Sequence, residues 1–250
     1  MIEADSTGRR KVPEQRLPSG KRQIFSFHIP GDIPDLQTLH LQVMDHNVGT
    51  LVLSKVAFIS HETVRAFLRA HLRIADVFWR DTLIDAAIYR EWMAGIGRRD
   101  AHARIAHLLC ELFLRLKAVG LTHGDAYEMP ITQAELADLL GLSTVHVNRT
   151  LQQLRGSGII STSREKVVIR NWNKLQEAGE FDRNSVPYAP KPTFFVGKLA
   201  AYVGNHTRVN SLSLGGVAVL PCPHQKNTGN MPSNAWNSPR KPKTSTSNPL

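Results

Sequence analysis

The chain lacks the features that mark secreted, membrane-spanning and cysteine-liganded proteins. Its 250 residues include only two cysteines, Cys110 and Cys222, which are too few and too far apart for a disulfide framework or a cysteine-ligated iron–sulfur cluster. No stretch approaches the roughly 20 apolar residues of a membrane span, and no signal peptide opens the chain. We therefore expect a cytoplasmic protein of one or two domains without a membrane partner. Cys110, on an apolar helix, is expected to be a small core residue.

Acidic residues are missing from the end of the chain. Residues 184–250 contain seven Lys or Arg and no Asp or Glu, so residues 1–183 hold 24 basic and 21 acidic residues, a net charge of +3 against +10 for the whole. A net charge of +10 would suggest a nucleic-acid partner, but most of that charge lies in this tail, so any such attraction must come from the local placement of charge. The tail is also rich in Asn, Ser, Thr, Pro and Gly. We expect residues 184–250 to be a disordered, low-complexity segment that is not an evolved domain.

The sequence also lacks the residue constellations of enzymes. It has no paired carboxylates, no nucleophile beside a base, no HExxH zinc motif and no phosphate loop. Ser163 and Lys166 have the spacing of a nucleophile motif, but they stand in a predicted turn without its other signatures. His28, His40 and His46 could gather around a metal, although scattered surface or core histidines are the more common case. We predict that the protein is not an enzyme and holds no metal.

The most informative stretch, residues 131–154, predicts two short helices joined by a tight turn. Thr132 and Glu135 have the spacing of a capping box, so a helix should begin at Gln133. Gly141 should end it in a left-handed conformation, and Ser143 can cap the next helix. Apolar residues then recur along one face of that second helix, which must pack inward: Val147, Leu151 and Leu154.

The opposite face of the second helix is left to side chains that suit contact with DNA: Thr144, Val145, His146, Asn148, Arg149 and Gln152. Thr, Asn, Arg and Gln hydrogen-bond to base edges and phosphates. Ala137 is small enough for the close approach of two helices that cross through a short turn. These features favour a helix-turn-helix. The alternative is an ordinary pair of antiparallel helices in a helical core, which uses the same turn.

A short hairpin is predicted after the second helix. Gly156 and Gly158 should end that helix, and residues 159–160 and 167–169 have the apolar character of two strands around a turn at 161–166. A hairpin that follows a recognition helix is a wing. Arg164, Lys166 and Arg170 could place positive charge beside phosphates there.

Residues 61–119 have helical spacing almost throughout. One apolar line contains Trp79, Leu83, Ala86 and Met93, and a second line contains Val77, Ile84, Ile88 and Trp92. A helix that is apolar on two adjoining lines must bury both, which suits packing on its own domain and on the same helix of a second subunit. The alternative is a helix buried in the core of a monomer. Gly95 and Gly97 predict a break, and a hinge, before a helix over about residues 100–117.

Together these residues resemble the Crp/Fnr family of bacterial transcription regulators. The resemblance covers about residues 23–182 and is strongest over residues 104–160, which include GLSTVHVNRTLQQLRGSGII. It implies an α+β fold with a partial sensory β-roll of the cyclic nucleotide-binding type (22–60), a linker and dimerisation helix (61–97) and a winged helix-turn-helix (98–183). Residues 1–21 are basic and are expected to be disordered.

The resemblance also implies a site. In this family the second helix enters the major groove of a palindromic DNA, so the expected partners are double-stranded DNA and a second copy of the chain, with RNA polymerase as a further candidate. The base-facing candidates by position are Thr144, Val145, Asn148 and Arg149, of which Arg149 matches the family's guanine-reading arginine. The phosphate-facing candidates are Thr132, Gln133, Ser143, Gln152, Arg164 and Lys166. Val145 stands where well-known members have glutamate, so the preference at that base step should differ.

The sensory part departs further from the family. Residues 22–27 alternate as a strand, Gly31 marks a turn, and further strands are expected over residues 48–59. The family's nucleotide pocket needs a glutamate for the ribose and an arginine for the cyclic phosphate. Asp35 is the only acid near the first position and residues 44–47 contain no arginine, so we predict no cyclic-nucleotide binding. The alternative function is a sensory or protein-interaction dimer whose truncated sensor no longer permits specific DNA binding.

Overall fold

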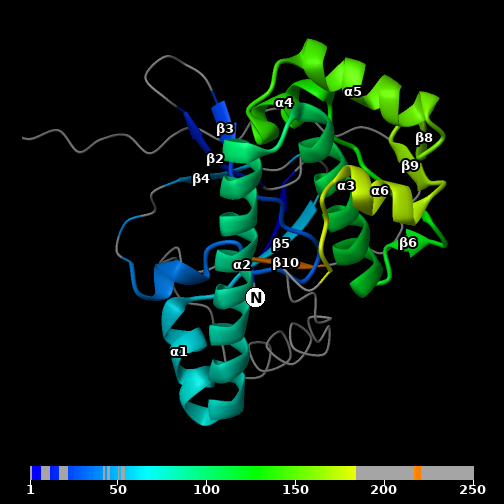
Figure 1. Cartoon of the computed structure of the whole chain (residues 1–250). Coiled ribbons are helices and arrows are strands. Elements are labelled where there is room, and N and C mark those ends of the chain that lie inside the picture. Colours follow the sequence, from blue (N-terminus) through cyan, green and yellow to red (C-terminus); the bar gives the residue numbers. More distant parts are fainter. Residues whose placement is uncertain are drawn as a thin grey trace, which may run out of the picture.

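The computed structural model describes residues 2–6, 12–16, 22–41, 43, 46–49, 51, 54–183 and 217–220. Within them two helices, α1 (His61–Ala70) and α2 (Leu72–Arg98), lead into a domain of helices and sheet (Figure 1). The other helices are α3 (Ala101–Ala118), α4 (Gln133–Leu140), α5 (Thr144–Gly156) and α6 (Trp172–Ala178), with a short 3-10 helix over Leu36–Leu39. Among the described residues no helix combines the length and the apolar content needed to cross a bilayer.

The C-terminal half is built around α3, which is buried along most of its length. Four antiparallel strands, β6 (Thr122–His123), β7 (Ala126–Glu128), β8 (Ile160–Ser163) and β9 (Lys166–Ile169), form a sheet in the order β6-β7-β9-β8. The pairing of Ile160 with Ile169 sets the register of the β8–β9 hairpin. One apolar core joins α3, α4, α5 and this hairpin. The predicted winged helix-turn-helix is confirmed.

The longest helix, α2, runs through the predicted break. Gly95 and Gly97 lie inside it, and the chain leaves the helix only at Arg99 and Asp100. The prediction of a break at the two glycines is wrong, because the backbone bond from Arg99 N to Gly95 O, 3.0 Å long, keeps the last turn intact. Gly95 is buried, and a Cβ there would lie 3.3 Å from Arg99 Nη1, so it serves close packing. Asp100 then caps α3 by accepting from Ala103 N at 2.8 Å.

The N-terminal region, together with residues 217–220, forms two small antiparallel sheets. β1 (Ile2–Ser6), β5 (Ser54–Phe58) and β10 (Val217–Leu220) form one in the order β1-β5-β10, and β3 (Arg22–Ile24), β2 (Val12–Arg16) and β4 (Asn47–Gly49) form the other in the order β3-β2-β4. The prediction of disorder is wrong for β1 and β2, within residues 1–21, and for β10, within residues 184–250. The backbone of β1 and of β10 pairs with β5, and that of β2 pairs with β3 and β4. The rest of the expected tail, residues 184–250, lies outside the described residues.

The expected β-roll strands are only partly present. The first is shorter than predicted, since β3 ends at Ile24, while β4 and β5 lie in the region where further strands were expected. The predicted turn is confirmed at Gly31, whose φ is +99°. The segment that follows β3 does not stand apart from the C-terminal half. Ile24, Phe27 and Ile29 are buried in the same apolar core as α3, α4 and α5.

Candidate nucleic-acid interface

Local hydrogen bonds fix both ends of α4. Thr132 Oγ1 accepts from Glu135 N at 3.2 Å, and Glu135 Oε2 accepts from Thr132 N at 2.8 Å, which completes the predicted capping box. At the other end Gly141 has φ +63°, a left-handed conformation that costs glycine little. The chain then turns sharply, since Leu142 N donates to Ala137 O at 3.0 Å. The turn between the two helices is as the sequence predicts.

The second helix, α5, shows the predicted division into two faces. Ser143 caps it by accepting from His146 N at 3.3 Å. Val147 and Leu154 are fully buried, whereas Val145 is 73% exposed and Arg149 is exposed as well. The outward face is therefore not packed into a helical core, which removes the alternative of an ordinary pair of antiparallel helices.

The structure brings two of the predicted site residues together across the motif. Asn148 Nδ2 donates to Gln133 Oε1 at 3.2 Å, so the base-facing candidate on α5 touches the phosphate-facing candidate at the start of α4. The side chain of His146 is also held, with Nδ1 2.9 Å from Ser143 Oγ. Neither contact was predicted from the sequence. The spacing of Ser143 and His146 could have indicated the second, whereas the first depends on how the helices cross.

The wing lies beside α5 and presents positive charge. The turn between β8 and β9 is only Arg164 and Glu165, shorter than the predicted 161–166, because the strands pair up to Ser163 and Lys166. Arg164 and Lys166 are exposed. Arg155 Nη1 donates to Thr162 Oγ1 at 2.9 Å and so ties the end of α5 to the wing. Thr132, Gln133, Ser143 and Gln152 are exposed too, and their contacts with DNA remain predictions.

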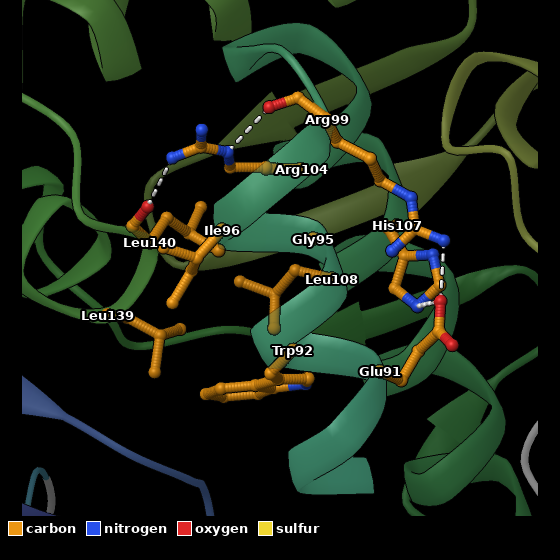
Figure 2. A pocket seen from close by; sticks show the side chains of 10 residues that line it. All are labelled: Glu91, Trp92, Gly95, Ile96, Arg99, Arg104, His107, Leu108, Leu139 and Leu140. Carbon is orange, nitrogen blue, oxygen red and sulfur yellow. Dashed lines mark hydrogen bonds and ion pairs between the residues drawn. The ribbon is translucent and has the colours of Figure 1, made fainter.

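The inner end of α4 is held by side chains from two other segments. Gln23 Nε2 donates to Leu139 O at 3.0 Å, and Arg104 Nη1 donates to Leu140 O at 3.1 Å, a bond that Figure 2 shows. Carbonyl groups at the end of a helix otherwise lack intrahelical partners, so these donors stabilise the end of α4. Arg22 also pairs with Asp138 at 2.8 Å. Strand β3 and α3 together support the motif from behind.

Figure 2 shows the crevice where α2, α3 and α4 meet. One side is apolar and includes Trp92, Ile96, Leu108, Leu139 and Leu140. On the other side Arg99 pairs with Glu91, and His107 Nε2 lies 3.8 Å from the same carboxylate. Burial lowers the pKa of His107 below 6.5, and the positive charge of Arg99 lowers it further.

The two apolar lines of α2 have different surroundings. Ile84 and Ile88 are buried in the chain's own interior. Trp79 is 66% exposed and Met93 is 72% exposed, while Leu83 is half exposed and Ala86 is partly buried. A helix buried in the core of a monomer would cover both lines. Only one of them is covered within the described residues.

The described residues give no support to a metal site or to a reactive thiol. Among the described residues no three His, Cys, Asp or Glu side chains group as metal ligands. Cys110 is completely buried, as predicted, and burial raises the pKa of its thiol to about 12. Since the thiolate is the form that binds metals, Cys110 is poorly suited as a ligand.

Comparison with known proteins agrees with this geometry. Residues 103–178 match the Crp-like helix-turn-helix domain family. The chain is 26% identical to the transcriptional activator protein FnrL of Cereibacter sphaeroides, over 69% of this chain and 71% of that protein. It is also 26% identical to the nitrogen fixation regulation protein FixK of Azorhizobium caulinodans, over 63% of each chain.

Solved structures show the same fold. FixK2 from Bradyrhizobium japonicum matches with a TM-score of 0.58 and 22% identity, over 70% of this chain and 85% of that chain. A CRP-family transcriptional regulator from Thermus thermophilus matches with a TM-score of 0.51 and 18% identity, over 76% of this chain and 100% of that chain. At this identity the likeness concerns the fold alone.

Proposed function

We propose that this chain is a DNA-binding transcription regulator of the Crp/Fnr family that binds a palindromic DNA site as a homodimer through α5. The observation that carries the proposal is the outward face of α5. It presents Arg149 and, in part, Asn148 to solvent on a helix whose opposite face is fixed in the core. Arg pairs with guanine through two hydrogen bonds, and such a pair provides about 1–3 kcal/mol of discrimination.

The exposed line of α2 supports the homodimer. Trp79, Leu83 and Met93 keep large apolar side chains in water, which soluble monomers rarely do along one continuous line. Pairing two copies of α2 through this line would bury them. The two α5 helices would then reach half-sites that lie about one turn of the DNA double helix apart, roughly 34 Å.

We also propose that no cyclic nucleotide is required, because the arginine that would hold the cyclic phosphate is missing from residues 44–47. RNA polymerase is a candidate further partner of the bound dimer. The protein would act where the chromosome lies, in the bacterial cytoplasm.

The test is selection of bound sites from a random DNA pool, followed by affinity measurements on the selected site. We expect a palindrome, and we expect Arg149→Ala to lower the preference at one G·C pair by about 5- to 150-fold. Arg69→Ala is the matched control, since it removes an exposed arginine from the last turn of α1. A wild-type chain that enriches no sequence would contradict the proposal and favour the alternative of an interaction dimer without specific DNA binding.

A further inference from the structure

The hydrogen bond between Gln133 and Asn148 joins the exposed side of α4 to the exposed side of α5. Its donor and acceptor are 15 residues apart in the chain, and Nδ2 and Oε1 are 3.2 Å apart. Asn148 is half-buried, whereas the other base-facing candidates are exposed. The side chain of Asn148 therefore has less freedom than its neighbours on α5.

Both partners stand on fixed backbone. Gln133 is the first residue of α4, directly after the N-cap Thr132 and within the capping box that Thr132 forms with Glu135. Asn148 follows Val147, which is completely buried. Because the backbone at neither position can move freely, the contact restricts rotation of the Asn148 amide.

The contact leaves Asn148 with a defined pair of hydrogen-bonding groups. An asparagine amide has one carbonyl oxygen and two N–H groups, and Gln133 occupies one of those N–H groups. The remaining N–H and Oδ1 match adenine, which offers the N7 acceptor and the N6 amino donor in the major groove.

We propose that Gln133 is a positioning residue for base recognition, which holds Asn148 so that its amide reads adenine at one step of each half-site. This inference rests on the proposed function. It differs from the expectation that Gln133 contacts a phosphate, because a phosphate contact strengthens binding to all sequences equally.

The experiment measures affinity of the full chain for duplexes in which each base pair of the selected half-site is replaced in turn. Wild type is compared with Gln133→Ala, Asn148→Ala and the double variant. We expect Asn148→Ala to lower the preference at one A·T pair by about 5- to 150-fold. Gln133→Ala should lower the preference at the same A·T pair to a smaller extent. The double variant should keep as much of this preference as Asn148→Ala does, because Gln133 acts only through Asn148.

Two further variants separate positioning from simple contact. Gln152→Ala removes the same type of side chain from an exposed, phosphate-facing position of α5, so it should weaken binding to all duplexes alike and change no base preference. Gln133→Glu keeps an oxygen acceptor for Asn148 Nδ2 but adds a negative charge near the DNA. It should weaken binding to all duplexes while keeping the preference for A·T. Thermal melting checks that alanine at this exposed helix start leaves the fold intact.

The outcomes are distinct. If Gln133→Ala weakens all duplexes equally, or relaxes a different pair from Asn148→Ala, the inference is wrong while the proposed function stands. If wild type has no preferred sequence, the proposed function fails and this inference fails with it. Loss of the same A·T preference in both single variants, with rescue by Gln133→Glu, supports the positioning role.

Discussion

Arg115 and Asp32, which are 83 residues apart, form a buried ion pair in which Arg115 Nη2 lies 3.0 Å from Asp32 Oδ2. The same guanidinium donates to Phe27 O at 2.7 Å and to Glu111 Oε1 at 3.2 Å. Trp92 Nε1 donates to the other oxygen of Glu111 at 2.6 Å. One buried network therefore joins the segment after β3 to α2 and α3.

We expect Arg115→Met to lower the free energy of unfolding by about 3–5 kcal/mol, because it leaves the carboxylates of Asp32 and Glu111 buried without this cation. Urea unfolding followed by circular dichroism measures the loss. Arg22→Met is the control, since the Arg22–Asp138 pair is partly exposed and should contribute less than about 1 kcal/mol. Equal losses in the two variants would show that the network does not hold the segment after β3 in place.

The end of α6 lies directly against the backbone of α3. A Cβ at Gly179 would lie 2.6 Å from His107 N and 2.9 Å from Ala106 C. We therefore expect Gly179→Ala to destabilise the protein by about 1–3 kcal/mol or more, since backbone must move to admit the methyl group. Gly97→Ala is the control, because nothing lies within 4 Å of its Cβ position, and alanine favours the helix by up to about 1 kcal/mol. A neutral Gly179→Ala would mean that α6 can shift away from α3.

The helix-turn-helix could be predicted to within a residue because its determinants are local. The capping box at Thr132, the left-handed Gly141 and the cap at Ser143 each act within one helical turn. Each contributes energy without help from distant parts of the chain, so the sequence alone indicates where the helices begin and end.

The features that could not be predicted depend on contacts between distant residues. Strand β1 pairs with β5, about 50 residues away in the chain, and the sequence of neither segment indicates which segment it will pair with. The same holds for the contact of Asn148 with Gln133, which requires the crossing angle of α4 and α5. The wrongly predicted break at Gly95 and Gly97 has another cause. Glycine costs a helix only about 1 kcal/mol, and the packing of α2 outweighs that penalty.

The exposed line of α2 gives a direct test of the dimer. Leu83→Glu would place a charge in the proposed interface, so we expect a monomer by sedimentation velocity, with a smaller advantage of the full palindrome over a single half-site than in wild type. The fold of the monomer should be unchanged within about 0.5 kcal/mol, because Leu83 is half exposed. Arg73→Glu changes charge at an exposed position about a quarter of a turn around the helix and should remain dimeric. A dimeric Leu83→Glu would place the interface elsewhere.

Stability should fall at acid pH because of His107. Burial first and Arg99 second lower its pKa below 6.5, and in the fold Nδ1 donates to Gly179 O at 3.1 Å. The unfolded chain then binds more protons than the folded one at pH values between the folded pKa and about 6.5, so this stability is complete above that range and is lost as pH falls through it. We expect the free energy of unfolding to drop more between about pH 7.5 and pH 5.5 in wild type than in His107→Gln. His123→Gln, which alters an exposed histidine of β6, should keep the wild-type drop. If His107→Gln loses as much stability on acidification as wild type, then another group carries the pH dependence.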